Sequence, residues 1–150
     1  MVVYIDKMNY KNVVSKRYVT TPAHVQEIMI DFLTMLGDKN WKLNGMPFFA
    51  AEKMANSDFV VYWMFAPTDL TSIPEEKEID YFSYFSLEHA ICCRVKKDFE
   101  ASEEKAMEAI RAFAQSKNFN LISPAYCMVN SDPEQPYAIY NVAFQEIDES

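Results

Sequence analysis

An internal repeat constrains the fold of this chain more than any other feature of its sequence. Asn40 to Phe49 reads Asn-Trp-Lys-Leu-Asn-Gly-Met-Pro-Phe-Phe, and Asn118 to Tyr126 reads Asn-Phe-Asn-Leu-Ile-Ser-Pro-Ala-Tyr. The two stretches share an asparagine followed by an aromatic residue, then a leucine, a proline and a final aromatic residue. Asn118 follows Asn40 by 78 positions. A repeat of this length predicts one supersecondary unit used twice.

The first half of the chain reads as βαββ. A β-prone run at 12–20 precedes Thr21-Pro22, which predicts a helix with threonine at the N-cap and proline at the first position. The helix should end at Gly37. Two strands, 46–55 and 59–66, should follow. The apolar face expected for the helix consists of Val25, Ile28, Met29, Phe32, Leu33 and Leu36.

The second of these strands, 59–66, is apolar on both faces, so we expect it to lie centrally in its sheet. The tight turn before it should be Asn56-Ser57-Asp58.

The second half repeats this order. A long strand at 82–97 is followed by a helix with Ser102 at its N-cap and by two closing strands around the turn 130–133. The segment 67–80, rich in Thr, Pro and Glu, reads as a linker. The sequence therefore predicts a single domain, 1–150, of two pseudo-symmetric halves at about 10–66 and 81–147.

The charge of the chain excludes several classes of partner. It carries 22 acidic and 14 basic residues, a formal net charge of -8. Nucleic acid and anionic membrane surfaces attract clustered Lys and Arg, so neither is an expected partner. A cationic ligand or a basic protein is favoured instead. We expect a cytoplasmic protein, because residues 1–10 do not form a signal peptide and nothing approaches the ~20 apolar residues of a membrane span.

Neither a cofactor nor a metal is predicted. Cys92, Cys93 and Cys127 lack the paired spacing of zinc sites or disulfide frameworks, and we interpret them as buried reduced thiols. His24 and His89 have no partner at ligand spacing. Two glycines in the whole chain are too few for a phosphate-binding loop or a dinucleotide fingerprint.

The tandem βαββ order resembles the GyrI-like family, the effector-binding domain of multidrug-sensing transcription regulators, which also occurs as stand-alone proteins. The local patterns are Gly45-Met46-Pro47-Phe48-Phe49, Phe65-Ala66-Pro67 and Pro124-Ala125-Tyr126. The resemblance implies an α+β fold in which the duplicated units form a curved antiparallel sheet with two helices on one face. It also implies a groove between the two halves that receives hydrophobic, often cationic, molecules.

The chain departs from the family pattern at the acidic residue expected to meet a ligand's positive charge. The family's glutamate follows a Pro-Ala-aromatic step, and here Cys127 stands at that position. Through the repeat, Cys127 aligns with Ala50, and strand alternation places Glu52 on the same face as Ala50. Glu52 is therefore the candidate ligand-facing carboxylate, with a solvated strand end as the alternative.

Small-molecule binding without catalysis is the leading functional hypothesis. The alternatives are a protein-interaction module with a closed groove and a hydrolase of the GyrI-like type, for which Cys127 offers no ready general base. The strand at 59–66, which is apolar on both faces, also allows a homodimer that forms through the sheet. The aromatic candidates offer stacking and cation-π surfaces, or alternatively belong to the core. The predicted ligand-binding residues are Glu52, Phe48, Phe49, Tyr62, Trp63, Tyr126, Cys127 and Tyr140.

Overall fold

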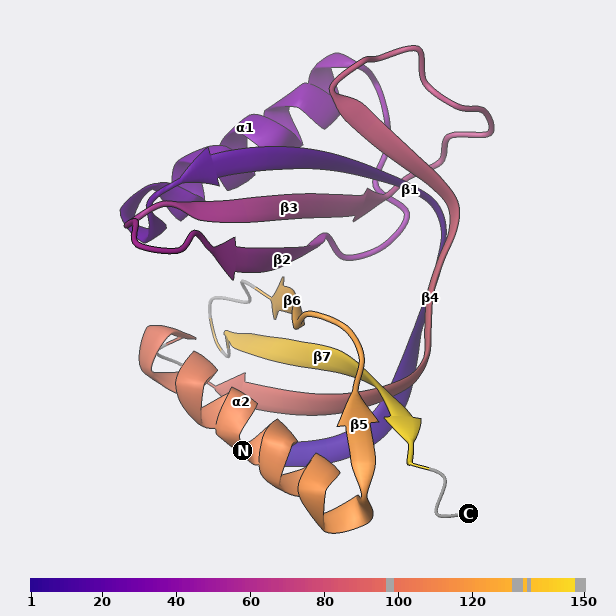
Figure 1. Cartoon of the computed structure of the whole chain (residues 1–150). Coiled ribbons are helices and arrows are strands. Elements are labelled where there is room, and N and C mark those ends of the chain that lie inside the picture. The colour runs from indigo at the N-terminus through magenta and orange to yellow at the C-terminus, as the bar shows by residue number, and fades with distance from the viewer. Residues whose placement is uncertain (97–98, 131–133, 135, 148–150) are drawn as a thin grey trace. The chain divides into compact units, whose positions relative to one another are not determined.

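The computed structural model of the chain describes residues 1–96, 99–130, 134 and 136–147 (Figure 1). The chain forms two compact units. One, the middle unit, is Tyr10–Phe85. The other, the terminal unit, combines Met1–Asn9 with Ser86–Ser150. Two long strands, β1 (Val2–Thr20) and β4 (Ile79–Lys96), contribute residues to both units.

The middle unit contains a 3-10 helix, η1 (Pro22–His24), one α-helix, α1 (Val25–Asp38), and the strands β2 (Phe48–Lys53) and β3 (Val60–Pro67). Its strands are ordered β4-β1-β3-β2. β3 pairs antiparallel with β1 on one side and β2 on the other. This arrangement confirms that the strand apolar on both faces is central.

The terminal unit contains α2 (Phe99–Lys117), the short strand β5 (Phe119–Leu121), β6 (Tyr126–Asn130) and β7 (Tyr137–Glu146). β7 pairs antiparallel with β4, with β6 and with β5. Each unit thus has a long strand, a helix and a closing pair of strands. The last strand of the pair lies in the middle: β3 lies between β1 and β2, and β7 lies between β4 and β6. The predicted α+β class and element order are confirmed.

Several predicted boundaries are wrong. β1 is a single strand of 19 residues that begins at Val2, ten positions before the predicted run at 12–20. Thr21 begins η1 and not α1, and its side chain makes no capping hydrogen bond. Ser102 lies inside α2, which begins three residues earlier. β5 was not expected, and part of the turn predicted at 130–133 lies outside the described residues.

Asparagine recurs in the repeat because both helices end in the same way. Asn40 and Asn118 each have positive φ, 57° and 59°. Asparagine tolerates this left-handed conformation better than most residues, and it is common just after a helix. The Asn40 amide donates to the Gly37 carbonyl, and the Asn118 amide donates to that of Gln115. The repeated Asn-aromatic pair therefore marks a helix end and the direction of the chain that follows.

The core of the middle unit forms between α1 and alternate residues of its sheet. Phe32 and Leu36 are 1% and 2% exposed on the inner face of α1. Val14 of β1 packs in the same cluster, together with Val60, Tyr62, Met64 and Ala66 of β3. Figure 1 shows α1 alongside β1 and β3. Burial of a large apolar side chain contributes about 1.5–3 kcal/mol, so this cluster is the main stabilising element of the unit.

The segment predicted as a linker begins with a buried anchor. Thr68 is 0% exposed, and both its amide and its hydroxyl donate to the Asn12 carbonyl, at 3.0 and 2.8 Å. Asn12 has φ 57°, and its side chain accepts a 2.5 Å hydrogen bond from Tyr81. The bonds hold β1 at Asn12, the end of β3 and the start of β4 together.

We expect Thr68→Val to lower the free energy of unfolding by about 1–2 kcal/mol, because it keeps the side chain's shape but removes a buried hydrogen bond. Urea denaturation measures the change. Thr71→Val is the matched control, since Thr71 is exposed, and it should change stability by less than about 0.5 kcal/mol. Equal effects of the two substitutions would contradict the anchoring role of Thr68.

Candidate functional site

The strand register divides the side chains of the middle unit between two faces. Side chains directly opposite each other in neighbouring strands share a face. Phe49 lies opposite Met64, and both pack on the α1 side together with Tyr62. The other face therefore carries three residues from each of β2 and β3: Phe48, Ala50, Glu52, Val61, Trp63 and Phe65.

Five aromatic rings form a continuous cluster that starts on this second face. The rings come from β1, β2, β3 and β4, and their centroids are 4.9–6.2 Å apart in six contacts. Phe48 and Phe65 are almost fully buried, whereas Phe82 is 39% exposed. The members of this aromatic cluster are Tyr10, Phe48, Phe65, Phe82 and Phe85.

Next to the aromatic cluster, Trp63 lies beside a small residue and two opposite charges. Its partners in the register are Ala50 on β2 and Arg17 on β1. Trp63 is partly exposed, while Arg17 and Glu52 are exposed. Glu52 lies opposite Val61, one pair further along the same face. The face thus offers an indole ring between a carboxylate and a guanidinium.

In the terminal unit, Cys127 and Tyr140 lie on the face that packs on α2. They are directly opposite each other and joined by a side-chain hydrogen bond. The pKa of Cys127 is raised to about 12, chiefly by burial; the hydrogen bond with Tyr140 lowers it and the nearby Glu103 carboxylate of α2 raises it. Burial also raises the pKa of Tyr140, with added contributions from Cys127 and Glu103. At neutral pH, Cys127 is therefore a protonated thiol, which is a poor nucleophile.

Tyr126 lies on the opposite face of the terminal unit, where it pairs with Asn141. Asn141 is 3% exposed, and its amide donates to the Tyr126 and Ile139 carbonyls. Its oxygen accepts a 3.1 Å hydrogen bond from the Cys92 thiol. The pKa of Cys92 is raised to about 12, chiefly by burial. All three cysteines are free and buried, as predicted.

The eight predicted site residues therefore lie on four sheet faces. Phe48, Trp63 and Glu52 share the face away from α1, and Phe49 and Tyr62 share the face toward it. Cys127 and Tyr140 face α2, whereas Tyr126 faces away from it. Their roles in binding stay predictions.

The predicted alignment of Cys127 with Ala50 agrees with the strand register, in which Cys127 pairs with Tyr140 as Ala50 pairs with Trp63, but it does not agree with the sheet faces. Ala50 belongs to the face away from α1, but Cys127 faces α2. An offset of 78 residues kept through these strands pairs Cys127 with Phe49, which faces α1. Pro47 and Pro124 are 77 positions apart, so aligning them changes the offset of the repeat from 78 to 77 residues. The sheet faces on which Ala50 and Cys127 lie do not match under this smaller offset. Glu52 still lies on the face of Phe48, but no longer as the counterpart of Cys127.

Sequence reasoning missed two groups of residues. Tyr10, Phe65, Phe82 and Phe85 were not selected, although the alternation of Phe65 with Trp63 in one strand was a usable signal. Glu103 was not selected either. Its spacing from the buried Ala106 and Ile110 places it on the inner stripe of α2, and partial burial raises the pKa of its carboxyl.

Among the described residues, no group of three or more His, Cys, Asp or Glu side chains is arranged to hold a metal ion.

None of the helices in the described part of the chain has the length and apolar character needed to cross a membrane.

Sequence comparison assigns the family. A family model described as a domain of unknown function, DUF5085, matches residues 9–146. The chain is a DUF5085 protein. No curated protein matches it significantly.

Solved structures show which fold this DUF5085 chain shares. The EcmrR C-terminal domain has a TM-score of 0.72 at 11% identity, with 97% of this chain and 98% of that one covered. A cryo-EM structure of the EcmrR–DNA complex gives 0.72 at 10% identity, but only 58% of that longer chain is covered. SAV2435 bound to tetraphenylphosphonium gives 0.58 at 12% identity, with 97% and 94% covered. The fold expected from the GyrI-like resemblance is confirmed.

The three thiols of the DUF5085 chain should be unreactive while it is folded, because all are buried and two have a pKa of about 12. A thiol-disulfide reagent at pH 8 should titrate almost no thiol in the native protein and three in urea. Rapid native labelling that disappears in Cys127→Ala would contradict this account of Cys127.

Proposed function

We propose that this protein binds a small apolar or cationic molecule on the face of the middle unit that lies away from α1. The observation that carries the proposal is the aromatic cluster, in which five rings from four strands gather on one side of a sheet. Aromatic faces bind flat apolar groups by stacking and attract cations through their quadrupoles. Membership of the GyrI-like family is part of this proposal.

The exposed part of Trp63 defines where the ligand would lie. Ala50, directly opposite Trp63 in the register, is 2% exposed, whereas the Trp63 ring is partly exposed and Glu52 and Arg17 are exposed. A ligand would therefore stack on the exposed part of the Trp63 ring, between the Glu52 and Arg17 side chains. The groove predicted between the two halves stays a prediction.

One structure of similar fold supports this class of ligand. SAV2435 is bound to tetraphenylphosphonium, an apolar cation with four phenyl rings. EcmrR supplies a second protein in which the same fold forms a C-terminal domain. Both are under 25% identical to this chain, so SAV2435 supports small-molecule binding as a hypothesis without identifying its ligand.

Two charged side chains on this face would act on a cationic ligand in opposite directions. Glu52 would attract a positive ligand, and Arg17, on the other side of Trp63, would repel it. Both side chains are exposed, so each effect is small. The overall charge of -8 adds a weak attraction for cations over the whole surface.

Tetraphenylphosphonium should stabilise the protein in a thermal-shift titration, and Trp63→Leu should raise its dissociation constant by about three- to tenfold through loss of the stacking surface. Phe59→Leu is the matched control, since Phe59 is 50% exposed and lies outside the aromatic cluster. Equal binding by the wild type and Trp63→Leu would contradict the proposed position, and no stabilisation at saturating concentration would contradict the ligand class.

Glu52→Gln and Arg17→Gln should change cation binding in opposite directions. We expect Glu52→Gln to weaken tetraphenylphosphonium binding by about two- to fivefold, and Arg17→Gln to strengthen it by a similar factor, because each removes one exposed charge near Trp63. Isothermal titration calorimetry at low salt measures both. Changes of the same sign, or none at low salt, would remove the two charges from the site.

A further inference from the structure

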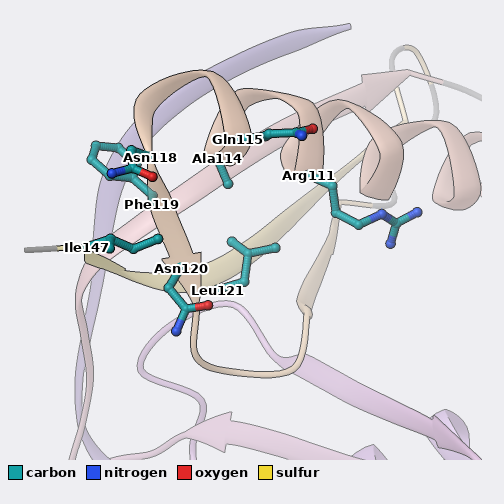
Figure 2. A pocket seen from close by; sticks show the side chains of 8 residues that line it. All are labelled: Arg111, Ala114, Gln115, Asn118, Phe119, Asn120, Leu121 and Ile147. Atoms are coloured by element: carbon teal, nitrogen blue, oxygen red, sulfur yellow. The ribbon is translucent and has the colours of Figure 1, made fainter. Parts of the chain in front are cut away.

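The terminal unit contains a pocket that the proposed function does not use. Its volume is about 360 Å³, within the range of roughly 300–1,000 Å³ typical of small-molecule sites. The pocket lies beside the C-terminal part of α2 and is bounded by β5 and Ile147 (Figure 2). Its floor is apolar, with side chains from Ala114, Phe119, Leu121 and Ile147.

The residues that line this pocket are held in place by strand pairing, ring stacking and a main-chain hydrogen bond. β5 pairs with the end of β7. The Phe119 ring stacks on Phe144 with centroids 4.3 Å apart and planes at 19°. The Ile147 amide donates to the Asn118 carbonyl at 3.2 Å, which closes the side of the pocket next to the helix end. The lining is therefore held by main-chain bonds and ring stacking before any ligand binds.

Among the described residues that line the pocket, Arg111 is the single one with a charged side chain. Within the described residues it forms no ion pair, although Glu108 is three positions earlier on the same helix. In Figure 2 its guanidinium lies at one end of the labelled residues, Leu121 is nearer the middle, and Ile147 is toward the other end. The amides of Gln115 and Asn120 add polar groups. The pocket thus offers an apolar surface with one positive charge that forms no ion pair within the described part of the chain.

We propose that this pocket binds a small amphipathic anion, a molecule with an apolar body and one carboxylate. The apolar body would lie on Phe119, Leu121 and Ile147, and the carboxylate would pair with the guanidinium of Arg111. An arginine-carboxylate pair is planar and bidentate, which fixes the orientation of the ligand. We expect the carboxylate at Arg111 and not at the C-terminal end of α2, because the free carbonyl groups there repel negative charge.

This site is independent of the proposed function. It lies in the other unit, it takes a ligand of the opposite charge, and it uses none of the residues of the aromatic cluster. The two proposals can therefore fail separately.

Octanoate is the probe that tests the site, with octylammonium as its cationic counterpart. In two-dimensional NMR titrations of the full chain, octanoate should shift the amide signals of Asn118, Phe119, Leu121 and Ile147 in a saturable way. Octylammonium should not shift them. The indole signal of Trp63 reports on the proposed site in the middle unit and should stay unchanged with octanoate.

Substitutions of the arginine decide whether its charge carries the binding. Arg111→Gln should weaken octanoate binding by about two- to fivefold, the range expected for the loss of one exposed charge pair. Arg111→Lys should lose less, because it retains the charge without the fork. Lys105→Gln is the matched control, an exposed cation of the same helix outside the pocket lining, and should bind octanoate as the wild type does. Binding that is unchanged in Arg111→Gln, equal shifts with octylammonium, or no saturable shifts at these amides would each overturn the proposal.

Discussion

The packing of each helix on alternate residues of its own sheet is the constraint on which the rest of the structure depends. In the middle unit, Phe32 and Leu36 cover Val14, Tyr62 and Met64. In the terminal unit, the inner stripe of α2 carries Ala106, Ile110 and Ala114, and Glu103 at its N-terminal end lies near Cys127 and Tyr140. Because strand side chains alternate, every residue used on one face fixes its neighbours on the other.

The proposed ligand face is a consequence of that alternation. Once Tyr62 and Met64 face α1, Trp63 and Phe65 must face away from it, and the pairing of β2 with β3 adds Phe48 and Ala50 to the same side. The aromatic cluster then forms because β1 and β4 bring Tyr10, Phe82 and Phe85 to that position. The same rule explains why Cys127 is a poor candidate for chemistry: it faces the helix, is buried, and has a raised pKa.

The sequence predicted the elements well because their signals are local. Helical spacing of apolar residues located α1, and the two-sided apolar run located β3 and its central position. The repeated Asn-aromatic pair has a physical cause in the left-handed residue after each helix. Sequence failed where the outcome depends on tertiary structure. Thr68 reads as part of a polar linker, yet it is buried against Asn12, 56 positions away.

The candidate site was harder to predict than the fold, because a shift of one residue moves a side chain to the other face of its sheet. Aligning the prolines of the repeat introduced such a shift. It matched Cys127, which faces α2, with Ala50, which faces away from α1. The pocket next to Arg111 had no sequence signal at all, because its lining comes from the end of a helix, a three-residue strand and Ile147. Only the folded chain brings these residues together.

The two tryptophans allow the most direct test of the central claim, that a small molecule binds on the face away from α1. Trp41 packs against the α1 core and lies under Lys39, whereas Trp63 is on the other face. Their two indole signals can be followed separately in an NMR titration with tetraphenylphosphonium. The account predicts a saturable shift of the Trp63 signal while that of Trp41 stays in place. A shift of the Trp41 signal alone, or of neither signal at saturating ligand, would contradict it.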